Sequence, residues 1–496
     1  MSSNTGHPSL PLIGPGLHYR PFECIKGRIM DQLRLYWKNA TAEAVGDKHG
    51  VTDKELKQIA PRIKDLTRQM AEDRKAGKLR YRDLPYDEDM VDSVHREVEH
   101  FRDRCDVLIV LGIGGSALGN IALQNALNPY TYNLMSDRTR PGPQLFVLDN
   151  VDPDQIKAVV ELITPKIKKT IVNVVSKSGE TAETASQFIL FRDLLQQKLG
   201  KKYKENILAT TDAKEGTLRE ICNAEGFRTL EVPEGVGGRF TVMSAVGLFS
   251  AAMCGIDVDA LLAGAGDMDK RLKDGDVFKN PAAMIAAVNY LLNEKGKTIS
   301  VMMPYSTSLY SLADWFRQLW AESLGKQNGL KRKNVFAGQT PIKALGTTDQ
   351  HSQVQLYREG PNDKVITFLE VERFAQKLTI PSSMKGVATL GYLAGANFQT
   401  LINSEKVGTE YALLESQRPT MTCVLPQISP QAIGQFLYAY EVAVSYMGGL
   451  FEINTYDQPA VQLGKDATYA LMGKGGFADL AKKIQPVTKR DSKYLI

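Results

Sequence analysis

Residues 171–181 read IVNVVSKSGET, an apolar run that passes into a short loop rich in hydroxyl groups. An amphipathic segment with Phe188 and Leu195 follows, so the pattern predicts a strand, a turn and a helix. The start of such a helix offers free backbone N–H groups. With the hydroxyls of Ser176, Ser178 and Thr181, these groups suit a phosphate ester. The same side chains can instead cap the helix, and this stretch alone leaves both interpretations open.

On either side of this stretch, strands and helices alternate through the first half of the chain. Further strands are predicted at 107–111, 144–149 and 206–210, and a helix at 153–162. The run 107–111 is apolar at every position, which is typical of a strand buried on both faces. Such alternation favours a mostly parallel sheet with helices on its faces.

The alternation returns in the second half and indicates a second αβ layer sandwich. Residues 20–102, in contrast, show helical stripes and no strand pattern, so we expect an N-terminal helical layer there. The elements predicted in the second half are helices at 244–253, 282–293, 308–323 and 433–447, and strands at 298–303, 365–371 and 422–425.

The fold class that these patterns predict is α/β. We expect two αβα sandwich subdomains with mostly parallel sheets, an N-terminal helical layer and a C-terminal helical tail, because 496 residues exceed one ordinary hydrophobic core. The predicted division is 1–102 for the N-terminal helical region, 103–270 for the first subdomain with loop 176–181, 271–450 for the second subdomain, and 451–496 for the tail.

Composition and charge argue against several classes of protein. With 43% hydrophobic and 24% charged residues and a net charge of +5, the chain is typical of a soluble globular protein. Basic residues do not cluster with aromatic ones, so we expect no nucleic-acid partner. No window is long and apolar enough for a membrane span, so we expect no membrane partner. Residues 1–16 lack a signal-peptide pattern, and the five cysteines show no CxxC spacing, which predicts reduced thiols, a cytoplasmic location and no zinc site.

The glycines of GIGGSALG at 112–119 raise the alternative of a nucleotide cofactor. Residues 112–117 fit the loose G-x-G-x-x-A form of a dinucleotide fingerprint, which needs an acidic residue about 20 positions further on. Asp149 lies 32 residues after Ala117, which is too far, and no GxxxxGK[ST] segment occurs. We therefore expect no cofactor, and we interpret this loop as one that packs glycines such as Gly115 against a substrate, with Ser116 as a hydrogen-bond donor.

Glu322 is the candidate base. It lies three residues after Leu319 on a predicted helix, which places it on the apolar face, and Gln318 one turn earlier shares that face. A partly desolvated carboxylate can accept a proton near neutral pH. The alternative is a residue at the helix border that pairs with Arg317 or Lys326.

Four further side chains are candidate site residues only when they are considered together, because each alone could be an ordinary structural or surface residue. His351 lies among small and amide residues, although a lone histidine is more often a structural residue. Arg239 follows two glycines and can present its guanidinium to a developing oxyanion. Gln458 and Lys465 are seven residues apart and face the same way if they share a helix, with Asp457 as its N-cap.

Six motifs together resemble the glucose-6-phosphate isomerase (phosphoglucose isomerase) family, which has two sugar-isomerase (SIS) subdomains. The resemblance implies that both predicted αβα sandwiches are of the SIS type. In the order of that family, the motifs are GIGGSALG (112–119), SKSGET (176–181), GVGGRFTVMSAVG (235–247), QLWAESLGK (318–326), GTTDQHSQ (346–353) and YDQPAVQLGK (456–465).

The resemblance also implies a role for each matching residue. Glu322 would move a proton between C1 and C2 of a sugar phosphate, and Arg239 would stabilise the enediol intermediate. His351 and Lys465 would assist ring opening, with His351 reaching the site from the second subunit of a homodimer. Such chemistry needs neither a metal nor a redox cofactor. The residues that would bind the substrate are Gly115, Ser116, Ser176, Lys177, Ser178, Thr181, Gln318 and Gln458.

The chain departs from the family pattern in two places. Ala460, Val461 and Gln462 stand where Gly-Val-Glu is usual, so a carboxylate near Lys465 is lost, and Thr241 stands where serine is usual. Neither change removes a residue that we assign to proton transfer. The leading hypothesis is therefore the isomerisation of glucose 6-phosphate and fructose 6-phosphate. The alternatives are a non-catalytic sugar-phosphate-binding regulator of the SIS type and an isomerase that also accepts mannose 6-phosphate.

Overall fold

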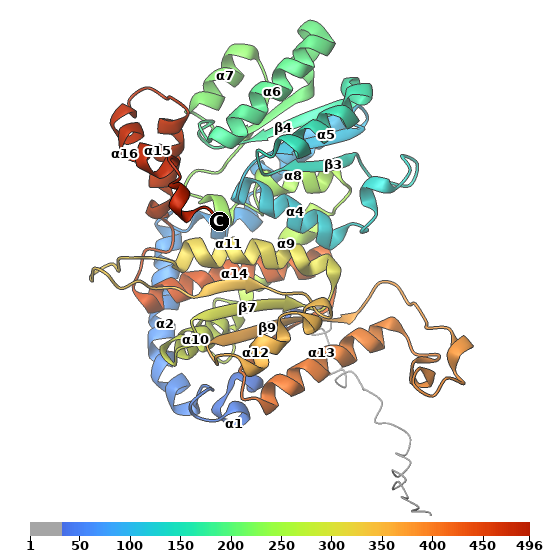
Figure 1. Cartoon of the computed structure of the whole chain (residues 1–496), viewed down its shortest axis with the longest axis vertical. Coiled ribbons are helices and arrows are strands. Elements are labelled where there is room, and N and C mark those ends of the chain that lie inside the picture. Colours follow the sequence, from blue (N-terminus) through green and yellow to red (C-terminus); the bar gives the residue numbers. More distant parts are fainter. Residues whose placement is uncertain (1–31) are drawn as a thin grey trace, which may run out of the picture.

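The computed structural model of the chain describes residues 32–496, so the predicted polar start at 1–16 and the beginning of the N-terminal region lie outside the described residues. Residues 32–496 form two five-stranded, mostly parallel sheets, with the strand orders β3-β2-β4-β5-β6 and β1-β10-β9-β7-β8. Helices cover both sheets, and α11 and α14 lie between them (Figure 1). The predicted α/β class with two mostly parallel sheets is confirmed.

The first sheet is entirely parallel and contains every strand predicted for the first half. Its central strands are buried at every position, which explains their unbroken apolar runs. The edge strand β6 was not predicted, because three of its four side chains are exposed or half-buried. The strands are β2 (Val107–Leu111), β3 (Gln144–Leu148), β4 (Thr170–Val175), β5 (Ile207–Thr211) and β6 (Arg228–Glu231), and the helices are α4 (Gly115–Leu127), α5 (Pro153–Ile163), α6 (Ala182–Leu199) and α7 (Thr217–Glu225).

The second sheet includes a strand from the N-terminal region, and there the sequence prediction was wrong. Strand β1 (Arg34–Tyr36) pairs antiparallel with β10 (Thr420–Gln427), although residues 20–102 were predicted to contain no strand. Three residues, two half-buried and one exposed, are too few to show a period of two, and the partner strand lies far away in the sequence. The other strands are parallel to their neighbours: β7 (Ile299–Pro304), β8 (Thr340–Lys343) and β9 (Lys364–Arg373).

Helix α14 (Pro430–Phe451) is buried along nearly its whole length and packs against α9 (Val258–Arg271), α10 (Pro281–Glu294) and α11 (Tyr310–Leu324). This packing explains why its sequence is apolar on all sides. The remaining α-helices of the described residues before the tail are α1 (Ala42–Val45), α2 (Asp53–Lys75), α3 (Glu88–Arg102), α8 (Ala245–Met253), α12 (Val354–Glu359) and α13 (Phe398–Glu415).

A buried carboxylate ties the N-terminal helices to the core. Asp269 on α9 accepts hydrogen bonds from Arg74, Arg82, Tyr86 and Tyr438. Burial alone would raise the pKa of Asp269, but the bonds from Tyr438 and Arg82 lower it to about 2. The N-terminal helices are therefore attached to the core by Asp269 and the arginine side chains that donate hydrogen bonds to it.

The tail contains two α-helices, α15 (Gln462–Leu471) and α16 (Ala478–Thr488), which lie beside the first sheet in Figure 1. A 3-10 helix, η12 (Pro459–Val461), precedes α15 and starts after Gln458. Asp457 was expected to be the N-cap of a helix that carries Gln458 and Lys465. This was wrong, because Gln458 is the N-cap of η12 and the Asp457 side chain accepts a hydrogen bond from Asn454. In residues 32–496, no helix is long and apolar enough to cross a membrane. The division at 102, 270 and 450 stays a prediction.

Candidate active site

Loop 176–181 joins β4 to α6, as the sequence predicted. Two of its hydroxyls shape the turn: Ser176 Oγ accepts a hydrogen bond from Gly179 N at 3.0 Å, and Ser178 Oγ accepts one from Glu180 N at 3.2 Å. Thr181 occupies the N-cap position of α6, but its side chain makes no capping hydrogen bond. The alternative in which the three hydroxyls simply cap the helix therefore does not describe this loop.

Lys177 and Thr181 point to different cavities. Thr181 lines a small cavity of about 220 Å³, whereas Lys177 lines one of about 840 Å³ that also contains Asp212. Hydrogen bonds from backbone N–H groups, first that of Lys214, lower the pKa of Asp212, and the charge of Lys177 adds to this effect. The structure thus separates the Lys177 side chain from the cavity beside Thr181.

Arg239 lies at the centre of the candidate site. Its side chain is only 1% exposed, and all five of its N–H donors are used. Burial lowers the pKa of Arg239, while the negative charge of Glu322 opposes that shift. The acceptors are Ser323 Oγ (2.8 Å), Glu322 Oε2 (3.3 Å), Gln458 Oε1 (2.8 Å), Asp457 O (3.3 Å) and Thr455 O.

Glu322 is held between two other predicted site residues. Its Oε1 accepts a hydrogen bond from Gln318 Nε2 at 3.1 Å, and its Oε2 faces Arg239. The side chain is 31% exposed, so it lies at the border of the buried face of α11, and its neighbours are polar and charged rather than apolar as expected. Neither alternative partner takes the carboxylate, because Arg317 pairs with Asp314 and Lys326 binds the backbone oxygen of Glu322.

The glycines of the 112–119 loop pack against protein, and not simply against a substrate as expected. A Cβ atom on Gly115 would lie 2.0 Å from Gly238 O and 2.8 Å from Arg239 N. One on Gly114 would lie 2.9 Å from Gln318 Nε2. These contacts bring the start of α4, with Ser116 in its first turn, against Arg239 and Gln318. We define Arg239, Gln318, Glu322, Ser323 and Gln458 as the Arg239 cluster.

The expectation that Gln458 and Lys465 share one helical face was wrong. Gln458 precedes η12 and binds Arg239, whereas Lys465 lies on α15 and lines the same cavity as Thr181. The turn at η12 separates the two side chains. The structure therefore brings Gln458 into the Arg239 cluster and Lys465 next to loop 176–181.

In the single chain, His351 belongs neither to the Arg239 cluster nor to the cavity that Lys465 and Thr181 line. It ends the 3-10 helix η9 (Thr348–His351) and is exposed. Within residues 32–496, no hydrogen bond or ion pair joins it to Arg239, Glu322 or Lys465. Its neighbour Gln350 instead accepts a hydrogen bond from Tyr305.

Lys326 was not predicted as a site residue, yet it connects Glu322 of the Arg239 cluster with Asp457, the residue before Gln458. Its Nζ donates to Glu322 O at 2.5 Å and to Asp457 O at 2.6 Å, and its side chain is 6% exposed. Burial and the nearby Arg239 charge lower the pKa of Lys326. Only its spacing of four residues from Glu322 could have indicated this role, because Asp457 lies 131 residues away.

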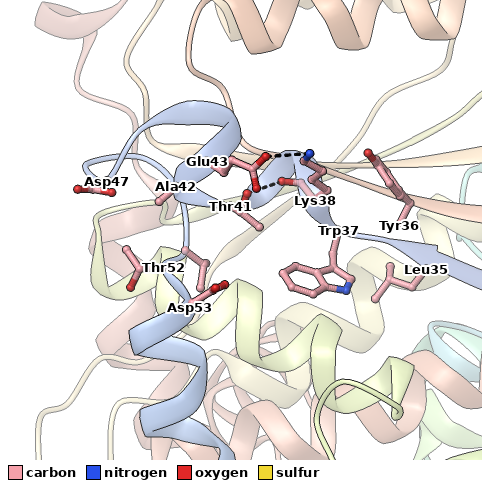
Figure 2. Close-up of a pocket in the computed structure, with 11 residues that line it drawn as sticks. Leu35, Tyr36, Trp37, Lys38, Thr41, Ala42, Glu43, Asp47, Thr52 and Asp53 are labelled. Atoms are coloured by element: carbon pink, nitrogen blue, oxygen red, sulfur yellow. Dashed lines mark hydrogen bonds and ion pairs between the residues drawn. The ribbon is translucent and has the colours of Figure 1, made fainter.

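A cavity of about 490 Å³ beside β1, α1 and α2 contains none of the predicted site residues (Figure 2). Lys38 and Glu43 form an ion pair of 2.9 Å on one side of it, and Trp37 lies on the other. Across residues 32–496, no group of three or more His, Cys, Asp or Glu side chains is arranged to hold a metal ion.

Comparison with known proteins identifies relatives over most of the chain. A family model described as phosphoglucose isomerase matches residues 90–476. Glucose-6-phosphate isomerase of Carboxydothermus hydrogenoformans is 42% identical over 428 residues, covering 86% of this chain and 92% of that protein. Glucose-6-phosphate isomerase of Rubrobacter xylanophilus is 41% identical over 431 residues, covering 86% and 96%.

Two solved structures share the fold of this chain. A hypothetical protein of Thermus thermophilus is 33% identical and matches with a TM-score of 0.78, covering 89% of this chain and all of that one. A glucose-6-phosphate isomerase of Chlamydia trachomatis, at 23% identity, shares the fold with a TM-score of 0.68 over 80% of this chain and 77% of that one. From the family model and the sequence identities, we conclude that this chain belongs to the phosphoglucose isomerase family.

Proposed function

We propose that this protein catalyses the reversible isomerisation of glucose 6-phosphate and fructose 6-phosphate, a step of glycolysis and gluconeogenesis. The observation that carries the proposal is the position of the Glu322 carboxylate, which is held between Gln318 and the buried Arg239 cation. Moving a proton between C1 and C2 needs one carboxylate base and one cation for the enediolate, and this pair supplies both.

The contacts of Arg239 suggest how it serves the intermediate. Its Nη2 donates to two backbone oxygens, those of Thr455 and Asp457, which hold the guanidinium in place. Its Nη1 donates to the side chains of Glu322 and Gln458, which can rotate away. An enediolate oxygen can therefore accept a hydrogen bond from Nη1 without displacement of the whole arginine, and the burial of Arg239 strengthens that bond.

The remaining roles follow the family pattern. Loop 176–181, with Ser116 and Gln458, would bind the phosphate and sugar, and Lys465 would assist ring opening from its place beside Thr181. We assign phosphate contact at position 177 to the backbone N–H, because the Lys177 side chain lines the other cavity.

We further propose that the protein is a cytoplasmic homodimer in which the partner subunit contributes a histidine at position 351. His351 is exposed in the single chain and stands apart from the Arg239 cluster. An arm formed by residues 374–398 extends from the body (Figure 1), and a second copy of the chain is the occupant we assign to its apolar surface. Its exposed apolar side chains are Leu378, Met384, Val387, Leu390, Tyr392 and Phe398.

The decisive test of catalysis is Glu322→Gln. Gln cannot accept the proton, so turnover should fall by about 10³-fold, while sugar-phosphate binding, measured by calorimetry, should persist. Glu72→Gln, at an exposed position on α2, is the matched control. An active Glu322→Gln variant would refute the assignment. Sugar-phosphate binding without conversion by the wild-type protein would favour the regulator, and a parallel assay with mannose 6-phosphate would reveal a broader range.

Subunit mixing tests the shared site. His351→Ala and Glu322→Gln homodimers should both be nearly inactive. A mixed dimer would regain one complete site, with Glu322 from one subunit and His351 from the other, and so up to half of the wild-type activity per dimer. If both residues act within one subunit, mixing restores nothing.

A further inference from the structure

Residues 462–488 form α15, α16 and the turn between them, and we call this segment the α15–α16 pair. It is attached to the rest of the molecule by few polar contacts. Among the described residues, the side-chain hydrogen bond and the ion pair that connect this pair with the body both end on Glu180. Tyr469 Oη donates to Glu180 O at 2.9 Å, and Lys474 Nζ lies 3.9 Å from Glu180 Oε2. Most of the pair is exposed, with Ala470 its single buried residue.

Glu180 is a residue of loop 176–181, and Tyr469 lies on the same helix as Lys465. The two α15 side chains are four residues apart, so they share one face about 6 Å apart along the axis. Lys465, Tyr469 and Thr181 also line one cavity of about 220 Å³. A bond from Tyr469 to Glu180 therefore sets the distance between Lys465 and Thr181.

The surroundings of Tyr469 keep its phenol as a donor. Its ring packs against that of Phe477, the N-cap residue of α16, at 5.7 Å between centroids, and Lys474 Nζ lies 4.2 Å from the centroid of the Tyr469 ring. Burial and the negative charges of Glu180 and Glu183 raise the pKa of Tyr469. The hydroxyl therefore stays protonated at neutral pH and can donate to the Glu180 carbonyl oxygen.

We infer that Tyr469 is a positioning residue that couples loop 176–181 to Lys465. The bond between Tyr469 and Glu180 seats α15 on the loop, so that a phosphate ester bound by the loop also orders the helix that carries Lys465. This inference rests on the proposed function, because it takes the loop as the phosphate site and Lys465 as a residue of the reaction. Tyr469 itself does not touch the substrate.

The variant Tyr469→Phe removes the hydroxyl and keeps the ring contacts with Phe477 and Lys474. Because one hydrogen bond is lost, kcat/KM for glucose 6-phosphate should fall about three- to tenfold. Tyr130→Phe, at an exposed position far from α15 in the sequence, makes the same chemical change and should leave kcat/KM unaltered. The melting temperature should stay within about 2 °C in both variants, because a surface contact contributes little to global unfolding.

Amide hydrogen exchange separates coupling from a merely structural role. The probe is sorbitol 6-phosphate, which carries the phosphate ester but no carbonyl group. In the wild-type homodimer it should slow exchange both in residues 177–181 and in α15. In Tyr469→Phe the loop should still be protected, and the protection of α15 should be lost.

Two results would overturn the inference, and they differ in what else they contradict. If the probe protects α15 equally in wild type and Tyr469→Phe, the coupling alone is wrong. If the probe protects neither residues 177–181 nor α15 of the wild-type protein, loop 176–181 is not the phosphate site. That result would contradict both the coupling and the phosphate-binding role that the proposed function gives to this loop.

Discussion

Arg239 and Lys465 are both cations in the proposed site, but the structure holds them in opposite ways. Arg239 is buried, and each of its N–H groups has an acceptor, two of them backbone oxygens. Lys465 is exposed on α15, and the side-chain hydrogen bond that connects α15 with the body runs from Tyr469 to the backbone oxygen of Glu180. We infer from this difference that the groups for proton transfer are preorganised, whereas the group assigned to ring opening lies on an element that the substrate can help to order.

The largest effect is expected from Arg239→Lys, which changes the buried one of these two cations. A lysine has three donors on a flexible stem and cannot replace the five donors of the planar guanidinium. The kcat for glucose 6-phosphate should fall by about 100- to 1,000-fold. Steady-state kinetics measure this, with circular dichroism as the check on folding. A folded variant with kcat close to wild type would show that Arg239 is not the cation that serves the intermediate.

The second largest effect is expected at Lys326, which connects Glu322 O with Asp457 O. Lys326→Met keeps most of the side-chain volume and removes both hydrogen bonds, so Asp457 and the adjoining Gln458 should lose their fixed position beside Arg239. We expect kcat to fall roughly 30-fold, with a smaller change in KM. Lys331→Met, in the exposed loop after α11, is the control. An equal loss in both variants would contradict a specific role for Lys326.

A third test addresses loop 176–181. The double variant Ser176→Ala with Thr181→Val removes two hydroxyls while Glu322 and Arg239 stay intact. KM for glucose 6-phosphate should rise about tenfold, and kcat should change less than threefold, because the phosphate contacts bind substrate and transition state alike. Steady-state kinetics measure KM and kcat separately, and the test compares the change in one with the change in the other. A loss confined to kcat would move these hydroxyls from phosphate binding to the chemical step.

The smallest effect is expected from Gln462→Glu, which supplies the carboxylate that the family resemblance implies at this position. Gln462 Nε2 now donates to Asp466 Oδ1 at 2.8 Å, and a glutamate would replace that bond by repulsion between two carboxylates. Because α15 is exposed, water and salt screen the new charge, so kcat/KM should change less than about threefold. A larger change would show that the charge next to Lys465 controls the reaction despite this exposure.

The parts of the fold that the sequence predicted are those with local patterns. Strands such as β2 and β4 are buried on both faces and show unbroken apolar runs, and α14 is apolar on all sides. The unpredicted strands β1, β6 and β8 are short and lie at or near sheet edges, where pairing with a distant strand, and not the local pattern, makes them strands.

The amino-acid sequence by itself determined the alternation of strands and helices, the position of loop 176–181 between β4 and α6, and the six motifs that indicate the family. Only the tertiary structure decided that Gln458 joins Arg239 while Lys465 joins Thr181, and that Lys326 and Tyr469 hold these two groups in place. Arg239 meets Glu322 and Gln458 across 83 and 219 residues of chain. Contacts at such separations depend on the packing of the whole molecule, which no local pattern of residues encodes.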